Sequence, residues 1–522
     1  MSGRTLTAKT LLQPIDRVAL GVMLVLSLLI GILLLSGDHT APRVRDFSWQ
    51  DKQVGAQDTA FTFTFSRPMN HDSVAANLKI TPPLPGKISW AGRRMAYTPL
   101  FPVPYGTEYK VQLQGAKDQF PGLQRKGTLI EPFTASFRTR DRAFIYIGVE
   151  KEEQGRLILY NLTAQKKMIL TPPDLVVMDF KPYPDGDRVL FAASDRKSQE
   201  QGLLNQQLYT VTTGLSFQIP GQAEASPNSL GRVDLVLDSK DYQNLKFDLS
   251  DDGKTIIVQR VNRRNPSEFG LWIIQPDAKP KPLENQPGGD FVITPDSSSV
   301  AIAQGQGVAI LPLTTAAKPL DFLPKFGMVL SFARDGSAAT MVKFNTDYTR
   351  SLFLITNQGV QKELLRTTGS IQSCEFTPTK EKLYCLLTQL IQGEEYQEEP
   401  FLAAIDLKDT KDSSESPVKP LVVLPNQRDI QMSLSPDGLA LLFDQVVTRP
   451  PSATDMLRTN EGQAIGQGLL WLLPLVEATS SNPPAQLQPE QLLSGFQPRW
   501  LPWIYSNFQV NWSINLIDLL QK

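Results

Sequence analysis

A short turn recurs seven times between residue 180 and the C-terminus, each time between two hydrophobic runs. The copies vary around Ser/Thr-Pro-Asp-Gly, stand 39 to 67 residues apart, and begin at Tyr183, Ser250, Thr294, Ala333, Thr377, Ser435 and, in truncated form, Leu501. Pro sets the first corner of such a turn, Asp hydrogen-bonds back onto it, and Gly takes the positive φ that reverses the chain. A repeat of about 40 residues or more, with four strands in each unit, is typical of a β-propeller.

The runs on either side of these turns have strand character. Apolar residues alternate before the turn, as at Leu245, Phe247 and Leu249, and continuous β-forming runs follow it at 255–258 and 440–443. These patterns predict the two inner strands of a blade, buried between neighbouring blades. The repeat resembles the propeller domain of TolB and its relatives over residues 141–503, and this resemblance implies a domain that binds partners.

The ends of the repeat region predict the number of blades. Residues 143–149, 157–161 and 168–171 resemble the last three strands of a blade that lacks its first strand. The segment from Gly495 to Trp500 resembles an innermost strand with no blade after it. We expect this segment to pair with 143–149 and close a ring of seven blades, with six or eight as the alternatives. Closure of this kind removes open sheet edges.

The N-terminal segment predicts a membrane anchor. Val18 to Ser36 is a run of 19 apolar or small residues, which as a helix spans about 28 Å, enough for a bilayer core. Arg4, Lys9 and Arg17 precede it against the single acid Asp16. The positive-inside bias therefore places residues 1–17 in the cytoplasm and the rest of the chain outside. A cleaved signal peptide is the alternative, but the apolar core is long and no Ala-x-Ala exit follows it.

Residues 41–140 predict a separate β-sandwich. Apolar residues alternate at Phe61, Phe63 and Phe65, and clusters of Pro and Gly interrupt the segment about every ten residues. The segment resembles the bacterial Ig-like domains of surface-layer and envelope proteins, on motifs at 65–70, 78–82, 97–99, 105–109 and 133–139. Tyr109 fits a tyrosine corner, a structural role. The resemblance implies a spacer or an adhesion module.

Composition argues against nucleic acid as a partner and against common catalytic sites. The formal net charge is −1 over 522 residues, so no basic surface is expected. The only histidines, His39 and His71, precede the propeller region, which excludes a Ser-His-Asp triad and a histidine-ligated metal there. The turn aspartates recur in nearly every repeat, so we interpret them as turn caps. We therefore expect no enzyme and no cofactor, with a glycan-cleaving site built from Tyr, Arg and Glu as the enzymatic alternative.

The only two cysteines, Cys374 and Cys385, flank the turn at 377–380. If Phe376 opposes Leu383 across that hairpin, the two thiols also oppose each other on one face. We therefore expect a disulfide within one blade, because adjacent strands bring Cα atoms within bonding range and an extracytoplasmic compartment permits oxidation. Two buried free thiols are the alternative.

The long insertions predict which face of the propeller binds. The turns between the first and second strands of each blade are tight, whereas long segments occur at the opposite ends of the strands, at 194–205, 221–244, 262–270, 390–400 and 447–466. Loops on a rigid scaffold concentrate binding residues. Two of these loops carry opposite charges. The candidate partner contacts are Arg263, Arg264, Glu394, Glu395 and Tyr396.

The sequence leaves two functions open. The first is a protein-interaction module tethered to the bacterial cytoplasmic membrane by residues 18–36, with the Ig-like domain at 41–140, the propeller at 141–503 and a C-terminal tail at 504–522. Its partner is a protein of the cell envelope or a glycan. The second is a structural or adhesive envelope protein that binds wall or surface polymer through the Ig-like domain.

Overall fold

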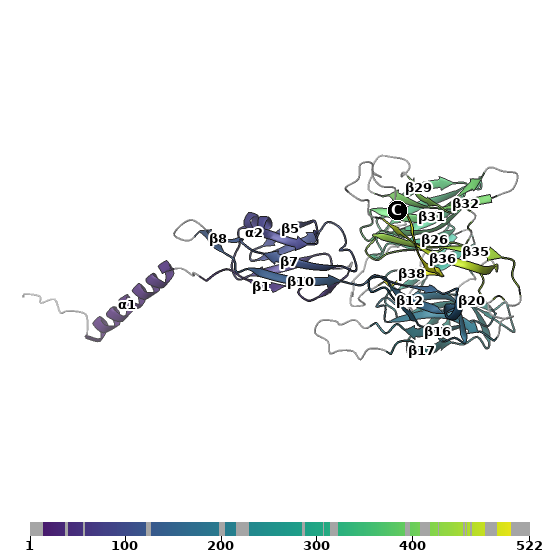
Figure 1. Cartoon of the computed structure of the whole chain (residues 1–522), viewed down its shortest axis with the longest axis horizontal. Helices are drawn as coiled ribbons and strands as arrows, with labels where there is room; N and C mark the ends of the chain where they lie inside the picture. Colours follow the sequence, from purple (N-terminus) through teal and green to yellow (C-terminus); the bar gives the residue numbers. More distant parts are fainter. Residues whose placement is uncertain are drawn as a thin grey trace, which may run out of the picture. The chain divides into compact units, whose positions relative to one another are not determined.

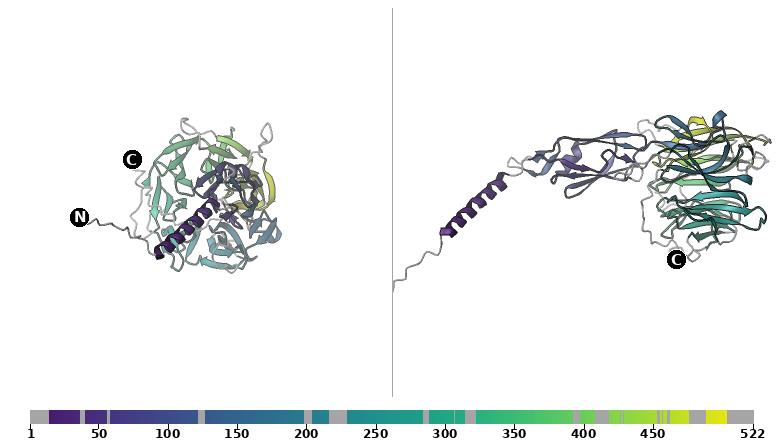
Figure 2. Two further views of the ribbon diagram at one scale, coloured as in Figure 1. Left: turned by 90° about the vertical axis from the view of Figure 1, so that its left-hand side faces the viewer. Right: turned by 90° about the horizontal axis from the view of Figure 1, so that it is seen from below.

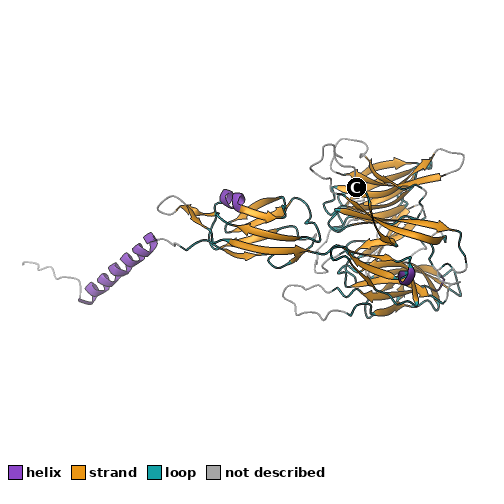
Figure 3. Cartoon of the chain, in the orientation of Figure 1, coloured by secondary structure: helices purple, strands orange, loops and turns teal. Residues whose placement is uncertain are grey.

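The computed structural model describes residues 14–36, 40–55, 58–121, 127–197, 204–215, 229–283, 288–305, 307–313, 322–391, 397–407, 418–425, 427, 429–452, 455, 457–459, 462–475 and 488–502. Strands make up most of these residues, apart from α1, α2 and the 3-10 turn η1 (Lys151–Glu153) (Figure 3). Contacts divide the chain into two compact units. The first comprises residues 1–52, 59–100 and 108–138, and the second comprises residues 53–58, 101–107 and 139–522.

The N-terminal helix α1 spans Pro14–Ser36 (Figure 1), so it begins four residues before the apolar run that starts at Val18. Val18, Leu24 and Ile30 on this helix are exposed. Among the described residues, no helix has the length and hydropathy of a membrane span.

Two four-stranded sheets and a small hairpin form the β-sandwich. One sheet has the order β1-β3-β6-β5 and the other β2-β10-β7-β4, while β8 pairs with β9. The bounds are β1 Val44–Phe47, β2 Gln53–Val54, β3 Phe61–Phe65, β4 Leu78–Thr81, β5 Gly86–Ala91, β6 Arg94–Pro99, β7 Glu108–Leu113, β8 Lys117–Pro121, β9 Gly127–Leu129 and β10 Phe133–Thr139. The sequence pattern did not predict α2 (His71–Asn77), which begins where the Asn70 side chain accepts a hydrogen bond from the Ser73 backbone N–H at 2.8 Å.

The core of the sandwich is aromatic. Phe61, Phe63 and Phe65 are fully buried, while the threonines between them are partly exposed, as the alternating pattern predicts. Phe61 stacks on Tyr97 at 4.9 Å between ring centroids. Tyr109 is also buried and stacks on Phe137 at 5.0 Å. These contacts give Tyr109 the structural role that the sequence suggested.

The second unit contains seven antiparallel sheets of four strands each, in the orders β13-β12-β11-β38, β14 to β17, β18 to β21, β22 to β25, β26 to β29, β30 to β33 and β34 to β37. Figure 2 shows them side by side around a common centre. The first three sheets consist of β11 Ala143–Ile147, β12 Leu157–Asn161, β13 Lys166–Ile169, β14 Leu175–Pro182, β15 Arg188–Asp195, β16 Gln207–Thr212, β17 Val233–Leu237, β18 Tyr242–Leu249, β19 Ile256–Asn262, β20 Phe269–Ile274 and β21 Lys281–Pro282, together with β38 Phe496–Trp500.

The other four sheets follow in chain order. Their strands are β22 Phe291–Ile293, β23 Ser299–Gln304, β24 Gly307–Pro312, β25 Phe322–Leu323, β26 Met328–Phe332, β27 Ala338–Phe344, β28 Arg350–Thr356, β29 Gln361–Thr367, β30 Ile371–Phe376, β31 Lys382–Ile391, β32 Gln397–Asp406, β33 Val418–Val423, β34 Met432–Leu434, β35 Ala440–Arg449, β36 Ala464–Pro474 and β37 Glu490–Ser494. Apolar clusters fill the spaces between neighbouring sheets; one of them combines residues of β31 and β32 with residues of β34, β35 and β36.

The last strand, β38, joins the first sheet of the unit. It pairs antiparallel with β11, with Phe144 opposite Trp500 and Ile147 opposite Phe496, so the sheet combines strands that are more than 300 residues apart in the chain. The Trp500 ring packs edge-on against Phe144 at 5.6 Å, and its indole N–H donates to the Ser433 carbonyl at 3.0 Å. Strand β38 therefore connects the first sheet to the seventh.

The first strands of neighbouring sheets are also linked by charge. Lys181 on β14 forms an ion pair with Asp248 on β18. Lys246 on β18 pairs with Asp290, just before β22, at 2.5 Å. Further contacts join β18 to β22, β22 to β26, β26 to β30, β30 to β34 and β34 to β38. The innermost strands thus form a chain of contacts from one sheet to the next.

The repeated turns have the geometry that their residues predict. The fourth residue has a positive φ in six of them, at Gly186, Gly253, Ser297, Gly336, Lys380 and Gly438. Each turn aspartate accepts a hydrogen bond from the backbone N–H two residues further on, as Asp437 does from Leu439 at 3.2 Å. The same contact recurs at Asp185, Asp252, Asp296 and Asp335. These side chains hold their own turns.

Replacing two of the turn glycines with alanine should have unequal effects. Gly336 and Gly438 have similar φ values of 68° and 71°, so both variants incur the cost of a left-handed alanine, about 1 kcal/mol. A Cβ on Gly438 would lie 2.7 Å from Pro378 Cδ in the neighbouring turn, whereas one on Gly336 meets nothing within 4 Å. We expect Gly438→Ala to lower the melting temperature clearly more than Gly336→Ala. Equal shifts would contradict the packing between these turns.

Candidate functional site

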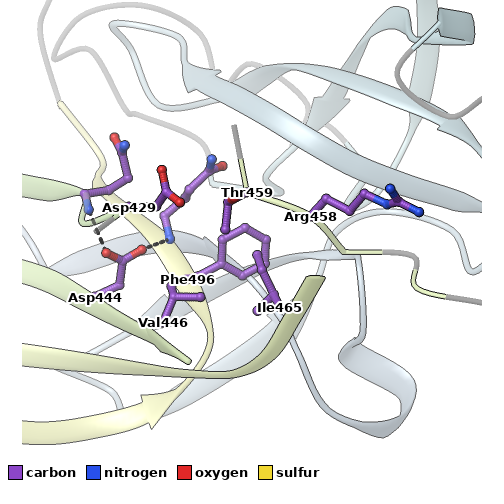
Figure 4. Close-up of a pocket in the computed structure, with 9 residues that line it drawn as sticks. Asp429, Asp444, Val446, Arg458, Thr459, Ile465 and Phe496 are labelled. Carbon is purple, nitrogen blue, oxygen red and sulfur yellow. Dashed lines mark hydrogen bonds between the residues drawn. The ribbon is translucent and has the colours of Figure 1, made fainter. Parts of the chain in front are cut away.

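A small pocket lies in the second unit, at the ends of the strands away from the repeated turns (Figure 4). Its walls come from the segment before β34, the middle of β35, the loop between β35 and β36, and the starts of β36 and β38. The lining residues are Asp429, Gln431, Asp444, Val446, Arg458, Thr459, Ile465, Phe496 and Gln497. The pocket has about 20 Å³ of free space, roughly enough for one water molecule.

Asp444 forms the polar base of the pocket. One carboxylate oxygen accepts the Gln431 backbone N–H at 2.6 Å and the other accepts the Gln497 backbone N–H at 2.7 Å (Figure 4). The side chain is fully buried. Burial raises the pKa of Asp444 to about 7, although the backbone donors act in the opposite direction. This carboxyl therefore holds three segments of the chain together at the site.

Two buried oxygens in the pocket have no hydrogen-bond partner among the described residues, Thr459 Oγ1 and Gln497 Oε1. Thr459 is only 7% exposed. Gln497 has a left-handed φ of 52° at the point where the register between β38 and β11 shifts. Non-glycine residues with a positive φ are uncommon and can mark functional sites.

The structure places Arg263 and Arg264 in the loop between β19 and β20. The Arg263 guanidinium donates to the Ser239 carbonyl at 2.8 Å, to Asn205 Oδ1 at 2.9 Å and to the Leu204 carbonyl. Its hydrogen bonds therefore hold neighbouring loops together. Arg264 is exposed, and among the described residues its backbone N–H alone is bonded, to Asn262 Oδ1 at 2.8 Å. Of the two arginines, Arg264 has the side chain available to a partner.

The candidates in the acidic loop, Glu394, Glu395 and Tyr396, lie outside the described residues. Strands β31 and β32 extend to the edges of that segment, where Ile391 opposes Gln397. The arrangement of the two oppositely charged loops is therefore not defined by the structure.

Cys374 on β30 lies opposite Cys385 on β31. The structure joins their sulfur atoms at 2.05 Å, with 4.1 Å between the Cα atoms, and both side chains are buried. The two cysteines lie within a single sheet, and neither lines the pocket.

We expect the two cysteines to be oxidised in the purified protein. Unfolded, unreduced protein treated with an alkylating reagent should then gain no alkyl group by intact mass, and should gain two after reduction. Replacing both cysteines with alanine should lower the free energy of unfolding by about 2–3 kcal/mol, because the closed loop is short. Uptake of two groups before reduction would contradict the disulfide.

Sequence reasoning missed the pocket residues. The available signal was Asp444, an acidic residue directly after the apolar run 440–443 of a buried strand. Such a residue must be hydrogen-bonded in the folded protein. Its donors come from Gln431 and Gln497, which are distant in sequence, and no local pattern identifies them.

Comparison with known proteins gives a specific result for the first unit. Residues 38–139 match the family model of the bacterial Ig-like domain. Comparison with curated protein sequences found no match. This match covers the strands of the sandwich.

Solved structures give distant similarities that extend over the second unit. TolB from Acinetobacter baumannii is 12% identical, with 82% of this chain and 84% of that chain covered and a TM-score of 0.38. A putative 6-phosphogluconolactonase from Bacteroides uniformis is 10% identical, with coverages of 69% and 99% and a TM-score of 0.40. An oligogalacturonate lyase from Vibrio parahaemolyticus is 10% identical, with coverages of 58% and 87% and a TM-score of 0.39. Similarities at this level carry no argument about activity.

Proposed function

We propose that this chain is a membrane-tethered, extracytoplasmic protein-interaction module of the bacterial cell envelope. Its second unit, a seven-bladed propeller, binds a protein partner through the face that carries the long loops. The observation that carries this proposal is the exposed side chain of Arg264 on that face, beside loops that Arg263 joins by three hydrogen bonds. Loops held in place on a rigid scaffold are suited to recognition.

The propeller geometry is supported by the sheet order. Seven sheets of four strands follow one another, and strand β38 pairs with β11 of the first sheet. Rigid sheets of this kind hold their connecting loops in place and make them suitable for recognition. The proposal involves no catalytic step, because the recurring aspartates serve their own turns.

The sequence of the N-terminal segment supports the proposed membrane anchor. The apolar run from Val18 to Ser36 and the basic residues before it favour a single span with residues 1–17 in the cytoplasm. A cysteine introduced at an exposed position of the Ig-like domain, such as Asp72, tests this orientation, in a background without Cys374 and Cys385. An impermeant thiol reagent should label it in intact spheroplasts. Labelling only after lysis would reverse the orientation.

A second candidate function is suggested by the match to the bacterial Ig-like family. In that alternative the Ig-like domain binds wall or surface polymer and the propeller has a structural role. Affinity capture of the full chain from solubilised membranes distinguishes the two functions. A protein partner retained in fixed stoichiometry would support the interaction module. Retention on purified wall polymer without a protein partner would favour adhesion.

A further inference from the structure

We propose that Tyr348 is the central contact of the face that carries the long loops (the long-loop face), and that its ring inserts into an apolar pocket of the protein partner. The inference rests on the proposed function, because it names the residue and the chemistry of that contact. Tyr348 lies in the loop between β27 and β28, at the ends of the strands away from the repeated turns. Its side chain is 92% exposed, the highest fraction among the described large hydrophobic side chains.

The backbone of Tyr348 has a conformation that a large side chain disfavours. Its φ is 64°, in the left-handed region that is unusual for a bulky residue. The loop 356–360, at the other end of β28, has the same pair of backbone hydrogen bonds, and Gly359 occupies the equivalent position with a φ of 80°. Glycine is the ordinary residue there because it has no Cβ. A tyrosine held in this conformation indicates a role other than the stability of the loop.

Hydrogen bonds hold this loop in one arrangement. The Tyr348 N–H donates to the Asn345 carbonyl at 3.2 Å, and the Asn345 N–H donates to the Thr349 carbonyl at 2.9 Å. The Asp347 carboxylate accepts the Thr349 hydroxyl at 2.6 Å and the Arg366 guanidinium at 2.5 Å. An exposed aromatic ring on an ordered loop loses little conformational freedom when it is bound, which favours affinity.

Opposite charges pair with each other beside the loop. Hydrogen bonds from Thr349 and Arg366 lower the pKa of Asp347 to about 2, so this carboxylate stays ionised and paired with Arg366 at neutral pH. Arg350, at the start of β28, pairs with Glu398 on β32 of the next sheet at 3.9 Å. A partner therefore gains little from a net charge at this position, and apolar contact is the attraction that the loop offers.

Further apolar side chains are exposed at the same ends of the strands. Phe344, at the end of β27, is 57% exposed, and Leu390 and Ile391, at the end of β31 in the neighbouring sheet, are also exposed. Groups of exposed apolar side chains are typical of protein interfaces, where tyrosine is often a dominant contact. A ring that projects as far as that of Tyr348 is covered on both faces only by a concave surface, so the partner is expected to provide an apolar pocket.

Photo-crosslinking of the full chain in cells tests this inference, with a photoreactive residue at Phe344 as the probe. We expect a covalent adduct with one protein of defined mass. Tyr348→Asn should reduce the yield of this adduct at least tenfold, whereas Tyr348→Phe, which keeps the ring, should retain at least half of it. A photoreactive residue at Val360, which is exposed in the loop at the other end of β28, should give no adduct.

The melting temperature separates binding from a structural role of Tyr348. Asparagine adopts a positive φ more readily than tyrosine does. Tyr348→Asn should therefore melt at the same temperature as the unsubstituted protein or higher, although it loses the adduct. Tyr348→Phe has the same backbone strain as the unsubstituted protein and should melt with it.

Several results would overturn the inference. These are an adduct yield that is the same with tyrosine and asparagine at position 348, adducts with lipid or glycan instead of protein, and a lower melting temperature of Tyr348→Asn. No adduct at Phe344, together with stoichiometric capture of a protein partner by the full chain, would remove this inference and leave the proposed function intact. Absence of any protein partner in both experiments would contradict the proposed function as well.

Discussion

Truncation of the chain after Ser494 should abolish cooperative folding of the second unit. The deletion removes β38 and leaves the edge of β11 unpaired, although all five residues of β11 are buried in the folded protein. It also removes the Trp500 contacts with Phe144 and Ser433 and the backbone donor of Gln497 to Asp444. An open, apolar strand edge also favours aggregation.

A smaller C-terminal deletion provides the matched control. A chain that ends at Pro502 retains β38 with all of its described contacts, and we expect it to unfold in the same cooperative transition as the full chain. Within the full chain, Trp500→Ala should lower the free energy of unfolding by about 3–5 kcal/mol, as large aromatic deletions in a core do. Thermal unfolding measures the stability of the second unit in each of these proteins. Cooperative unfolding of the chain that ends at Ser494, at an unchanged temperature, would contradict a structural role for β38.

The variant Asp444→Asn should change how stability depends on pH. Burial raises the pKa of Asp444 from 3.8 to about 7, so the folded state binds this proton more tightly than the unfolded state. The resulting stabilisation is complete below the unfolded pKa and is lost as pH rises through about 7. Relative to the variant, the unsubstituted protein should gain roughly 2–3 kcal/mol between pH 8 and pH 5.

Asparagine cannot replace the carboxyl fully, because its amide nitrogen would face one of the two backbone N–H donors. Urea unfolding at several pH values measures the difference between the two proteins. Glu375 also has a pKa raised to about 7 by burial, so only the comparison with the variant isolates Asp444. Asp241→Asn, at an exposed position, is the matched control for replacing a carboxyl with an amide. A difference between Asp444→Asn and the unsubstituted protein that stays constant with pH would exclude the raised pKa.

The local patterns of the sequence predict most of the strands and turns. The Pro-Asp-Gly turns appear where Pro, Asp and Gly predict them, because these residues act on their own backbone. The alternation at 61–65 gives the correct inward face of β3, since side chains alternate strictly along a strand. The segment 495–500 contains β38, which pairs with β11 as its position at the end of the repeats predicts.

The candidate site was less predictable. Arg263 stood out in the sequence as a loop charge, but its guanidinium binds carbonyl groups that only the folded chain brings near it. Asp444, Thr459 and Gln497 come from separate strands and loops, and their convergence depends on the pairing of β38 with β11. Charge and loop length predict a binding face of the second unit, whereas hydrogen bonding identifies the pocket.

Site-specific photo-crosslinking in cells tests the long-loop face most directly. A photoreactive residue is placed in turn at Arg264 and Arg458 on that face, and at the exposed positions Lys254 and Lys279 beside the turns at the opposite ends of the strands. We predict covalent adducts of one defined additional mass at Arg264 and Arg458, and none at Lys254 or Lys279. Adducts confined to Lys254 and Lys279 would contradict the assignment of the binding face.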